Sequence, residues 1–506
     1  MQRKTIALAC AALGMGFASS AFAQTPGAFD NPEVKVILSG ATAPDNFLAT
    51  IAGGLFEAGF HRFQDNAGTP ANFGDDGRGH NAFFGRVKND ASIPPSLRGR
   101  TVLFVKRSRG GSVWGVNPVA RGQRIETLDI TSTSCVLEAG SYRCNVKGID
   151  PGLPGYTAST NAGEPSDFGV SDVEPAMFKG PYNVEFGQAQ LSNVEVARME
   201  VKPVNVLTMG IVATNGVPAT TMLSRAAYGA MLSGNYTDWS QVDPSLTSGN
   251  TNVVVCRRVQ GSGTQTSYNW YFNNFPCQSA AAGTVAPTRM SNSEGYRTAG
   301  TGTQADPYII DPTLGYTVVE NPGSGNVRDC LRTAHNNLDH NFRGEDGLWY
   351  RVKFSNTSGT PFRAIGVLSG DSASNANPDG NGWSFRYLDG AGVFNINTQA
   401  NAGGSADKGI APSKANLING SYDFAVELTM QYRKVAVTND HGDNIAALSG
   451  LKRDFANEFI KRAGDPAFNT SAWVAALPPT FDPTTNPNVA KGSRFGNTCS
   501  PLQLLY

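Results

Sequence analysis

Short apolar runs alternate with helical spacing of apolar residues along much of this chain. Runs typical of buried strands occupy 34–38, 101–105, 206–213, 253–256 and 364–368, and 422–432 alternates like a half-exposed strand. Apolar residues spaced as on one helical face mark 48–55, 223–232, 265–275 and 448–460. Strands that alternate with helices in this way predict an α/β fold with mostly parallel sheets.

Polar, loop-forming segments separate these elements. The segments 59–95, 122–165, 278–322 and 370–411 are rich in Gly, Asn, Asp, Ser, Thr or Pro, which predicts long loops or small insertions. The chain of 506 residues is long enough for two or three domains.

The N-terminus has the pattern of a secretory signal peptide. Arg3 and Lys4 precede an apolar run, and Ala21-Phe22-Ala23 fits the small-x-small cleavage pattern. We therefore expect residues 1–23 to be removed and the protein to be periplasmic or secreted. Since no later stretch approaches the ~20 apolar residues of a spanning helix, we expect no membrane span.

The balance of charge argues against nucleic acid as a partner. The chain has 41 basic and 41 acidic residues, and loss of residues 1–23, which hold Arg3, Lys4 and no acid, leaves 39 against 41. A surface that binds polyanions needs an excess of positive charge. Any anion site must therefore be local.

Six cysteines remain after residue 23, an even number that favours disulfides in an exported chain. Cys135 and Cys144 flank a hairpin-like turn, so we expect them to pair. Cys256 and Cys277 flank a strand–helix unit and could form a second bridge, which would leave Cys330 with Cys499; other connectivities stay open. A metal site is the rival interpretation, but no CxxC or HxxxH spacing supports it. Isolated polar histidines such as His335 and His340 are usually solvated rather than metal ligands.

The segment 253–275 is the strongest candidate for chemistry. A β-branched strand ends at Arg257 and Arg258, a Gly-Ser-Gly-Thr turn follows at 261–264, and an amphipathic helix begins. Free amides at a helix N-terminus, two hydroxyls and a guanidinium suit an oxyanion. The alternative is an ordinary strand-to-helix turn with a Ser or Thr cap. Similar polar loops at 39–44 and 108–112 also follow predicted strands, where ligands of α/β folds bind.

Several of these segments resemble the periplasmic phosphate-binding proteins of the PstS type, solute receptors of ABC transporters. Residues 39–42 (SGAT) resemble the family's GAGAT loop, 108–111 (SRGG) its SSGG loop, and 167–172 (DFGVSD) its DFGASD segment. Residues 234–239 (GNYTDW) are similar to its GKIKKW turn, and 257–264 (RRVQGSGT) to its RRADGSGT loop. The matches occur in the family's order between residue 34 and about 432.

The resemblance implies a bilobed, class II periplasmic-binding fold with an anion held between the lobes. One lobe would comprise 24–203 and 416–506, the other 204–415, with the hinge at the crossovers and long loops inserted. By motif match, the ligand-binding residues are Thr42, the Ala43 amide, Ser108, Asp172, Arg258, Gln260, Ser262, Gly263 and Thr264. The implied partners are phosphate or a related oxyanion and an ABC transporter permease. We expect a monomer without cofactor or metal.

Asp172 and Gln260 determine what such a site would select. A carboxylate that faces an anion is repulsive unless the ligand carries a proton, which hydrogen phosphate does and sulfate does not. Gln260 replaces the aspartate of the family's loop and could relax this selectivity. Arg109 replaces a small residue and points either to the cleft or to solvent.

Three classes of function stay open at this stage. The first is a solute-binding protein for phosphate or a similar oxyanion. The second is a secreted or surface-associated interaction protein whose long loops took over recognition on the same scaffold. The third is a phosphate-ester hydrolase, which lacks a recognisable nucleophile–base pair. We therefore expect a binding protein and not an enzyme.

Overall fold

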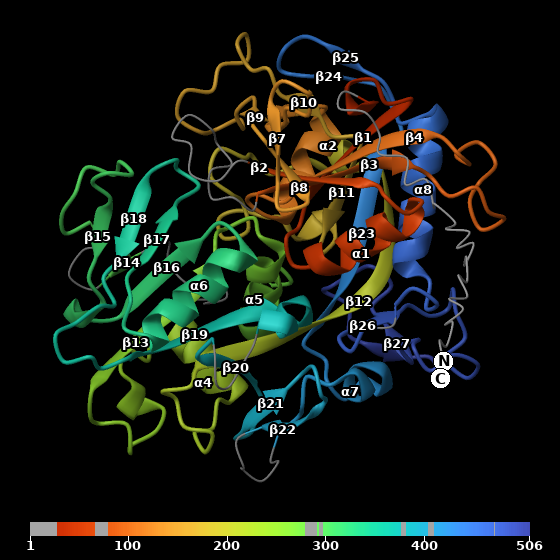
Figure 1. Cartoon of the computed structure of the whole chain (residues 1–506). Coiled ribbons are helices and arrows are strands. Elements are labelled where there is room, and N and C mark those ends of the chain that lie inside the picture. Colours follow the sequence, from red (N-terminus) through yellow and green to blue (C-terminus); the bar gives the residue numbers. More distant parts are fainter. Residues whose placement is uncertain are drawn as a thin grey trace, which may run out of the picture.

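A computed structural model of the chain describes residues 28–65, 79–278, 291–292, 297–375, 381–402, 409–469 and 471–506. The predicted signal peptide lies outside these residues. The described residues form two α/β lobes joined by long strands (Figure 1).

The first lobe is centred on three parallel strands. β1 (Val34–Gly40) lies between β4 (Thr101–Arg107) and β11 (Phe168–Ser171) and pairs with both in parallel. β3 (His80–Arg86) adds to β4 in antiparallel orientation, and β2 (His61–Asp65) adds to β3. Almost every side chain of β1 and β4 is buried, as expected for strands covered on both faces.

Two helices pack against this sheet. α1 (Asp45–Leu55) contributes Leu48 and Ile51, and α8 (Gly450–Gly464) contributes Phe455 and Phe459, to one buried cluster with Phe104 of β4. The ring centroids of Phe104 and Phe459 lie 5.0 Å apart. The apolar spacing that predicted both helices is therefore the stripe that each buries.

The second lobe repeats this plan. β13 (Asn250–Arg258) lies between β16 (Thr317–Asn321) and β19 (Phe362–Ser369), again in parallel. Three helices pack on it: α4 (Arg225–Leu232), α5 (Gly263–Asn273) and α6 (Ser324–His335). Val327 and Leu331 of α6 share a buried cluster with Val254 of β13.

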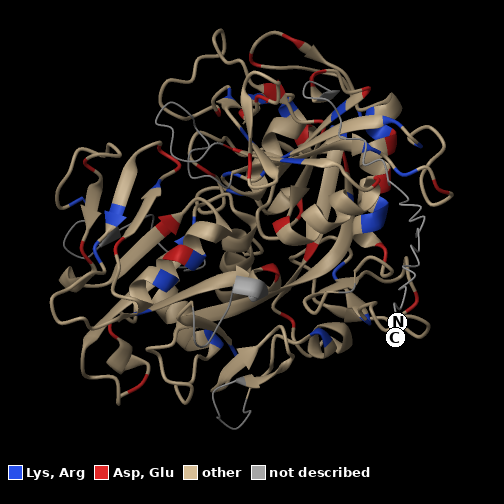
Figure 2. Cartoon of the chain, viewed as in Figure 1, with Lys and Arg blue, Asp and Glu red and all other residues tan. Residues whose placement is uncertain are grey.

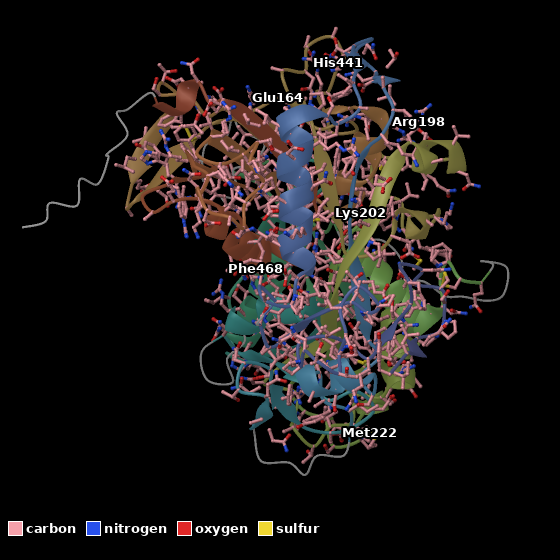
Figure 3. All side chains as sticks on the ribbon, turned by 90° about the vertical axis from the view of Figure 1, so that its right-hand side faces the viewer. Glu164, Arg198, Lys202, Met222, His441 and Phe468 are labelled. Atoms are coloured by element: carbon pink, nitrogen blue, oxygen red, sulfur yellow. A yellow bond between two sulfur atoms is a disulfide. The ribbon has the colours of Figure 1, made fainter. Side chains whose placement is uncertain are left out.

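The strand β12 (Met199–Thr214) belongs to both lobes. Its first part pairs with β23 (Ala425–Arg433), which also pairs with β11, and its last part pairs with β19 and β20 (Trp383–Arg386). Figure 3 shows the strand descending from Arg198 and Lys202 in one lobe towards the other lobe, where Met222 is labelled. The two central sheets are thus continuous through antiparallel strands.

Short elements occupy the remaining segments. The longer ones are α2 (Asn117–Arg121), β7 (Cys135–Glu138), β8 (Ser141–Cys144), α3 (Asn193–Ala197), β15 (Tyr308–Ile310), β17 (His340–Arg343), β18 (Trp349–Val352), β21 (Val393–Asn395), β22 (Ala400–Ala402), α7 (Lys414–Asn419) and β26 (Val474–Ala476). Strands of two residues are β5 (Arg124–Ile125), β6 (Thr127–Leu128), β9 (Val146–Lys147), β10 (Glu164–Pro165), β14 (Ser291–Asn292), β24 (Val437–Thr438), β25 (Asn444–Ile445), β27 (Gly492–Ser493) and β28 (Gln503–Leu504).

The predicted bilobed α/β class is confirmed, with parallel strands at the centre of each lobe and antiparallel strands around them. The prediction of loops or small insertions was wrong for β2 and β3 within 59–95, which join the first sheet. It was also wrong for β16 within 278–322 and β20 within 370–411, which belong to the second sheet. β3 was not predicted because the sequence around it is polar and rich in glycine, although its own Phe83 and Phe84 are buried.

One predicted disulfide is confirmed and two were wrong. Cys135 pairs with Cys144 across the β7–β8 hairpin. Cys256 pairs with Cys330, and Cys277 pairs with Cys499. The physical reason is packing: α6 covers the face of β13 that carries Cys256 and brings Cys330 to it, so Cys277 beyond α5 meets the C-terminal segment instead.

Candidate functional site

The loops that follow the six parallel strands meet between the lobes. Those after β1, β4 and β11 come from the first lobe, and those after β13, β16 and β19 from the second. The Val113 amide donates to the Gly261 carbonyl at 3.0 Å, so the loops after β4 and β13 touch. A Cβ atom on Gly111 would lie 2.5 Å from the Ser262 Cα, which is why only glycine permits this approach.

Arg258 joins the two lobes at the centre of this region. Its Nη1 donates to the Thr42 hydroxyl at 2.8 Å and to the Ser324 hydroxyl at 3.2 Å. Its Nε donates to the Asn321 carbonyl at 3.1 Å, and its Nη2 donates to the carbonyls of Pro322, at 2.8 Å, and Gly110. A guanidinium has five N–H groups, and the buried Arg258 directs all of them to protein oxygens.

The N-terminus of α5 is satisfied in the same way. The Ser262 hydroxyl caps the helix by accepting from the Gln265 amide at 3.4 Å. The Gly263 amide donates to the Ser112 hydroxyl at 3.0 Å, and Ser112 also accepts from the Asp172 amide at 3.2 Å. The alternative interpretation of this turn as a strand-to-helix turn with a Ser cap is therefore confirmed, and its Gly263 amide meets a hydroxyl group of the other lobe.

Asp172 is a buried acid beside the first turn of α5. Its Oδ2 accepts from the Thr264 hydroxyl at 3.2 Å, while Oδ1 is buried with no hydrogen-bond partner among the described residues. Burial raises the pKa of Asp172 to about 6, although the positive charge of Arg258 opposes the shift. This carboxyl can therefore accept a proton or a hydrogen bond from a ligand.

Lys106 is a cation that the sequence interpretation missed. Its buried Nζ donates to the Ser108 hydroxyl at 2.9 Å and to the Ala41 carbonyl at 3.1 Å, and lies 3.3 Å from Asp45 Oδ1. The Ser108 hydroxyl donates to the same Asp45 oxygen at 3.0 Å. Burial lowers the pKa of Lys106 and raises that of Asp45. A lysine at the end of an apolar strand was the signal that could have found it.

The remaining predicted residues are placed less centrally. The Ala43 carbonyl accepts from the Ser369 hydroxyl at 2.8 Å, so this segment also contacts the second lobe. Gln260 is buried in the turn between β13 and α5, and in the described structure its side chain makes no hydrogen bond to Arg258 or Asp172. Arg109 is buried rather than exposed, with its Nε 3.8 Å from Glu126 Oε1.

We also searched the described residues for metal-ligating side chains and for membrane-spanning helices. The described residues include no group of three His, Cys, Asp or Glu side chains that could hold a metal ion. The expectation that His340 is solvated was wrong: its side chain is buried, and its Nε2 lies 2.9 Å from Asn321 Oδ1. Burial lowers the pKa of His340 to about 3. No described helix is long and apolar enough to cross a membrane. Figure 2 shows acidic and basic residues interspersed over both lobes.

No protein-family model and no curated protein matches the chain. Solved structures that align with it include a candidate phosphate ABC transporter substrate-binding protein from Clostridium perfringens with bound phosphate, at 13% identity over 84% of this chain and 92% of that one, with a TM-score of 0.36. The high-affinity periplasmic phosphate-binding protein PfluDING aligns at 12% identity over 89% and 92%, with a TM-score of 0.40. PstS from Borrelia burgdorferi aligns at 11% identity over 79% and 87%, with a TM-score of 0.29. At these identities and TM-scores, the alignments assign the chain to no family.

Proposed function

We propose that this protein is an exported solute-binding protein that captures phosphate or a similar oxyanion between its two lobes. The observation that carries the proposal is the buried cluster of Arg258, Thr42, Thr264 and Asp172, to which both lobes contribute. Donors gathered away from water are what a dehydrated oxyanion needs, since each unmet polar group costs ~1–3 kcal/mol.

An anion would replace bonds that now hold the lobes together. Arg258 Nη1 is held by two hydroxyl groups, those of Thr42 and Ser324. Hydrogen bonds between ionised partners are roughly twice as strong as neutral ones. An oxyanion inserted at Nη1 would therefore be a better acceptor than either hydroxyl, and both hydroxyls could turn to donate to it.

The acid in the cluster favours a protonated anion. Asp172 Oδ1 has no hydrogen-bond partner in the described structure, so it is free to accept from a ligand hydroxyl. Hydrogen phosphate carries such a proton, and sulfate does not. Asp172 therefore supports phosphate as the preferred ligand.

The proposed lobes are residues 24–203 with 416–506, and residues 204–415. The crossovers run through β12 and the segment before β23, which fits a hinge at these two places. The Cys277–Cys499 bridge ties the second lobe to the C-terminal segment of the first. The proposal includes a periplasmic or secreted monomer, an ABC transporter permease as protein partner, and no catalytic activity.

A pair of matched arginine variants tests the site. Arg258→Lys should weaken phosphate binding by at least about tenfold, because the planar fork that can hold two oxygens is lost. Arg257→Lys is the control: Arg257 is equally buried but donates to Glu320 at 3.0 Å, outside the cluster. Its affinity should change by less than about twofold.

Isothermal titration of ligand-free protein measures both variants, with melting curves as a check of folding. Equal losses would place the anion elsewhere. Absence of anion binding in the wild-type protein would favour the interaction protein on the same scaffold.

A further inference from the structure

A cavity of about 420 Å³ adjoins the proposed anion site. Thr42, Ser108 and Ser324 line this cavity, and the same hydroxyl groups contact Arg258 or Lys106. Small organic ligands bind in cavities of roughly 300–1,000 Å³, and a phosphate ion alone fills only a fraction of this space. The cavity therefore has room for a group attached to the anion.

The side chains that line the cavity are polar, and several of them carry amide or guanidinium groups. Gln64 and Asn81 come from the first lobe, and Asn326 and Arg328 from α6 of the second. No aromatic ring and no branched aliphatic side chain lines the cavity in the described part of the chain. A nucleobase would find no stacking partner here, whereas hydroxyl groups can donate to and accept from amides.

Charge in the cavity is close to balanced. Arg109, Arg143 and Arg328 line the cavity together with Asp45, Asp329 and Asp371. A protonated Asp371 offsets no positive charge, but Arg109 Nε lies 3.8 Å from Glu126 Oε1 and Arg143 Nε lies 3.5 Å from Glu138 Oε2, so two of the three arginines have acidic neighbours outside the lining. A second phosphate group would therefore meet no large excess of positive charge, which argues against pyrophosphate.

Asp371 offers a place for a ligand hydroxyl. Its Oδ2 accepts from the Asn46 amide at 2.8 Å, while its Oδ1 is buried without a partner among the described residues. Burial raises the pKa of Asp371 to about 8, so at neutral pH the carboxyl carries a proton and can both donate and accept. A hydroxyl group matches that pair of roles.

We propose that the ligand is a phosphomonoester of a small hydroxylated compound, such as a sugar or polyol phosphate. Its phosphate would lie among the Thr42, Ser108 and Ser324 hydroxyls beside Arg258, and its hydroxyl groups in the cavity. This inference rests on the proposed function and adds the class of compound to it.

Titration of the ligand-free protein with four probes tests the proposal. The probes are inorganic phosphate, sorbitol 6-phosphate, pyrophosphate and adenosine monophosphate. The pH is near 6, where a phosphomonoester keeps part of its second proton for Asp172. Sorbitol 6-phosphate should bind at least about tenfold more tightly than the other three.

Two variants of the cavity wall, Asn81→Ala and Asn326→Ala, separate the cavity from the anion site. Each should lose most of the advantage of sorbitol 6-phosphate while binding inorganic phosphate as the wild-type protein does, which also shows that the variant is folded. Tight phosphate binding with weaker binding of sorbitol 6-phosphate would overturn this inference and leave the proposed function standing. Tighter binding of pyrophosphate or adenosine monophosphate would overturn it as well. If none of the probes binds, the proposed function itself fails.

Discussion

Substitution of Asp172 by asparagine tests whether the charge of this buried acid strains the folded protein. The pKa of Asp172 rises from 3.8 to about 6, chiefly because the carboxyl is buried. A carboxyl with a raised pKa stabilises the fold at low pH, and that stability is lost as the pH rises from about 4 through about 6. Above this window, the ionised carboxyl opposes folding.

The size of the effect follows from the two pKa values. The difference between 3.8 and about 6, at about 1.4 kcal/mol for each pH unit, gives about 3 kcal/mol. Asp172→Asn keeps an oxygen that can accept from the Thr264 hydroxyl but carries no charge. Without ligand, we therefore expect the variant to be more stable than the wild-type protein by about 3 kcal/mol near pH 8, and equally stable near pH 4.

Urea unfolding of ligand-free protein at the two pH values measures this difference, with the pH 4 pair as internal control. A variant that is as stable as the wild-type protein, or less stable, near pH 8 would refute the reasoning.

The same variant should bind sulfate more tightly relative to phosphate, because the repulsion that rejects fully ionised anions is gone. A selectivity changed by less than about twofold would mean that Asp172 does not face the ligand.

Three further predictions concern the surroundings of the site. Gln260→Asp should sharpen the preference for phosphate and favour lower pH, because a second acceptor demands another ligand proton; titration with phosphate and sulfate shows whether the residue faces the ligand at all. Burial and then the charge of Glu345 hold the pKa of Glu185 well above its usual range, so stability should fall as the pH rises above about 5. In Glu345→Gln, the melting temperature should therefore fall less between about pH 5 and pH 9 than in the wild-type protein. An unchanged dependence of the melting temperature on pH would contradict the interaction of Glu185 with Glu345. Replacing Cys277 and Cys499 together by serine should lower stability by ~2–4 kcal/mol, measured by urea unfolding under oxidising conditions, and unchanged stability would contradict this contribution of the bridge.

The sequence predicted the elements that carry long apolar patterns. The strand ending at Arg258 and the helix after Ser262 were both expected, because β-branched residues and a helical apolar stripe are local signals. β3 was missed because its buried phenylalanines stand inside a polar, glycine-rich segment. The length of β12, which serves two sheets, depends on strand partners far away in the chain.

The loops of the candidate site could be predicted from the sequence, but the hydrogen bonds between their side chains could not. The sequence placed Thr42, Asp172 and Arg258 in loops at strand ends, and the fold brings these loops together. The sequence could not show that Arg258 donates all its N–H groups to protein oxygens, or that the hydroxyl groups of Thr42 and Ser324 contact each other as well as Arg258. Those contacts depend on how the lobes pack. Lys106 was missed for the same reason, and the two wrong disulfides also reflect tertiary packing.

The proposed ligand-binding role predicts a simple result in solution. Purified protein should be unfolded to release bound ligand, refolded with its disulfides intact, and titrated calorimetrically with phosphate and with sulfate. We expect one phosphate-binding site per chain and clearly weaker binding of sulfate. Equal affinity for the two anions would contradict the role of Asp172, and binding of neither phosphate nor sulfate would contradict the proposal that Arg258 and its neighbours form an oxyanion site.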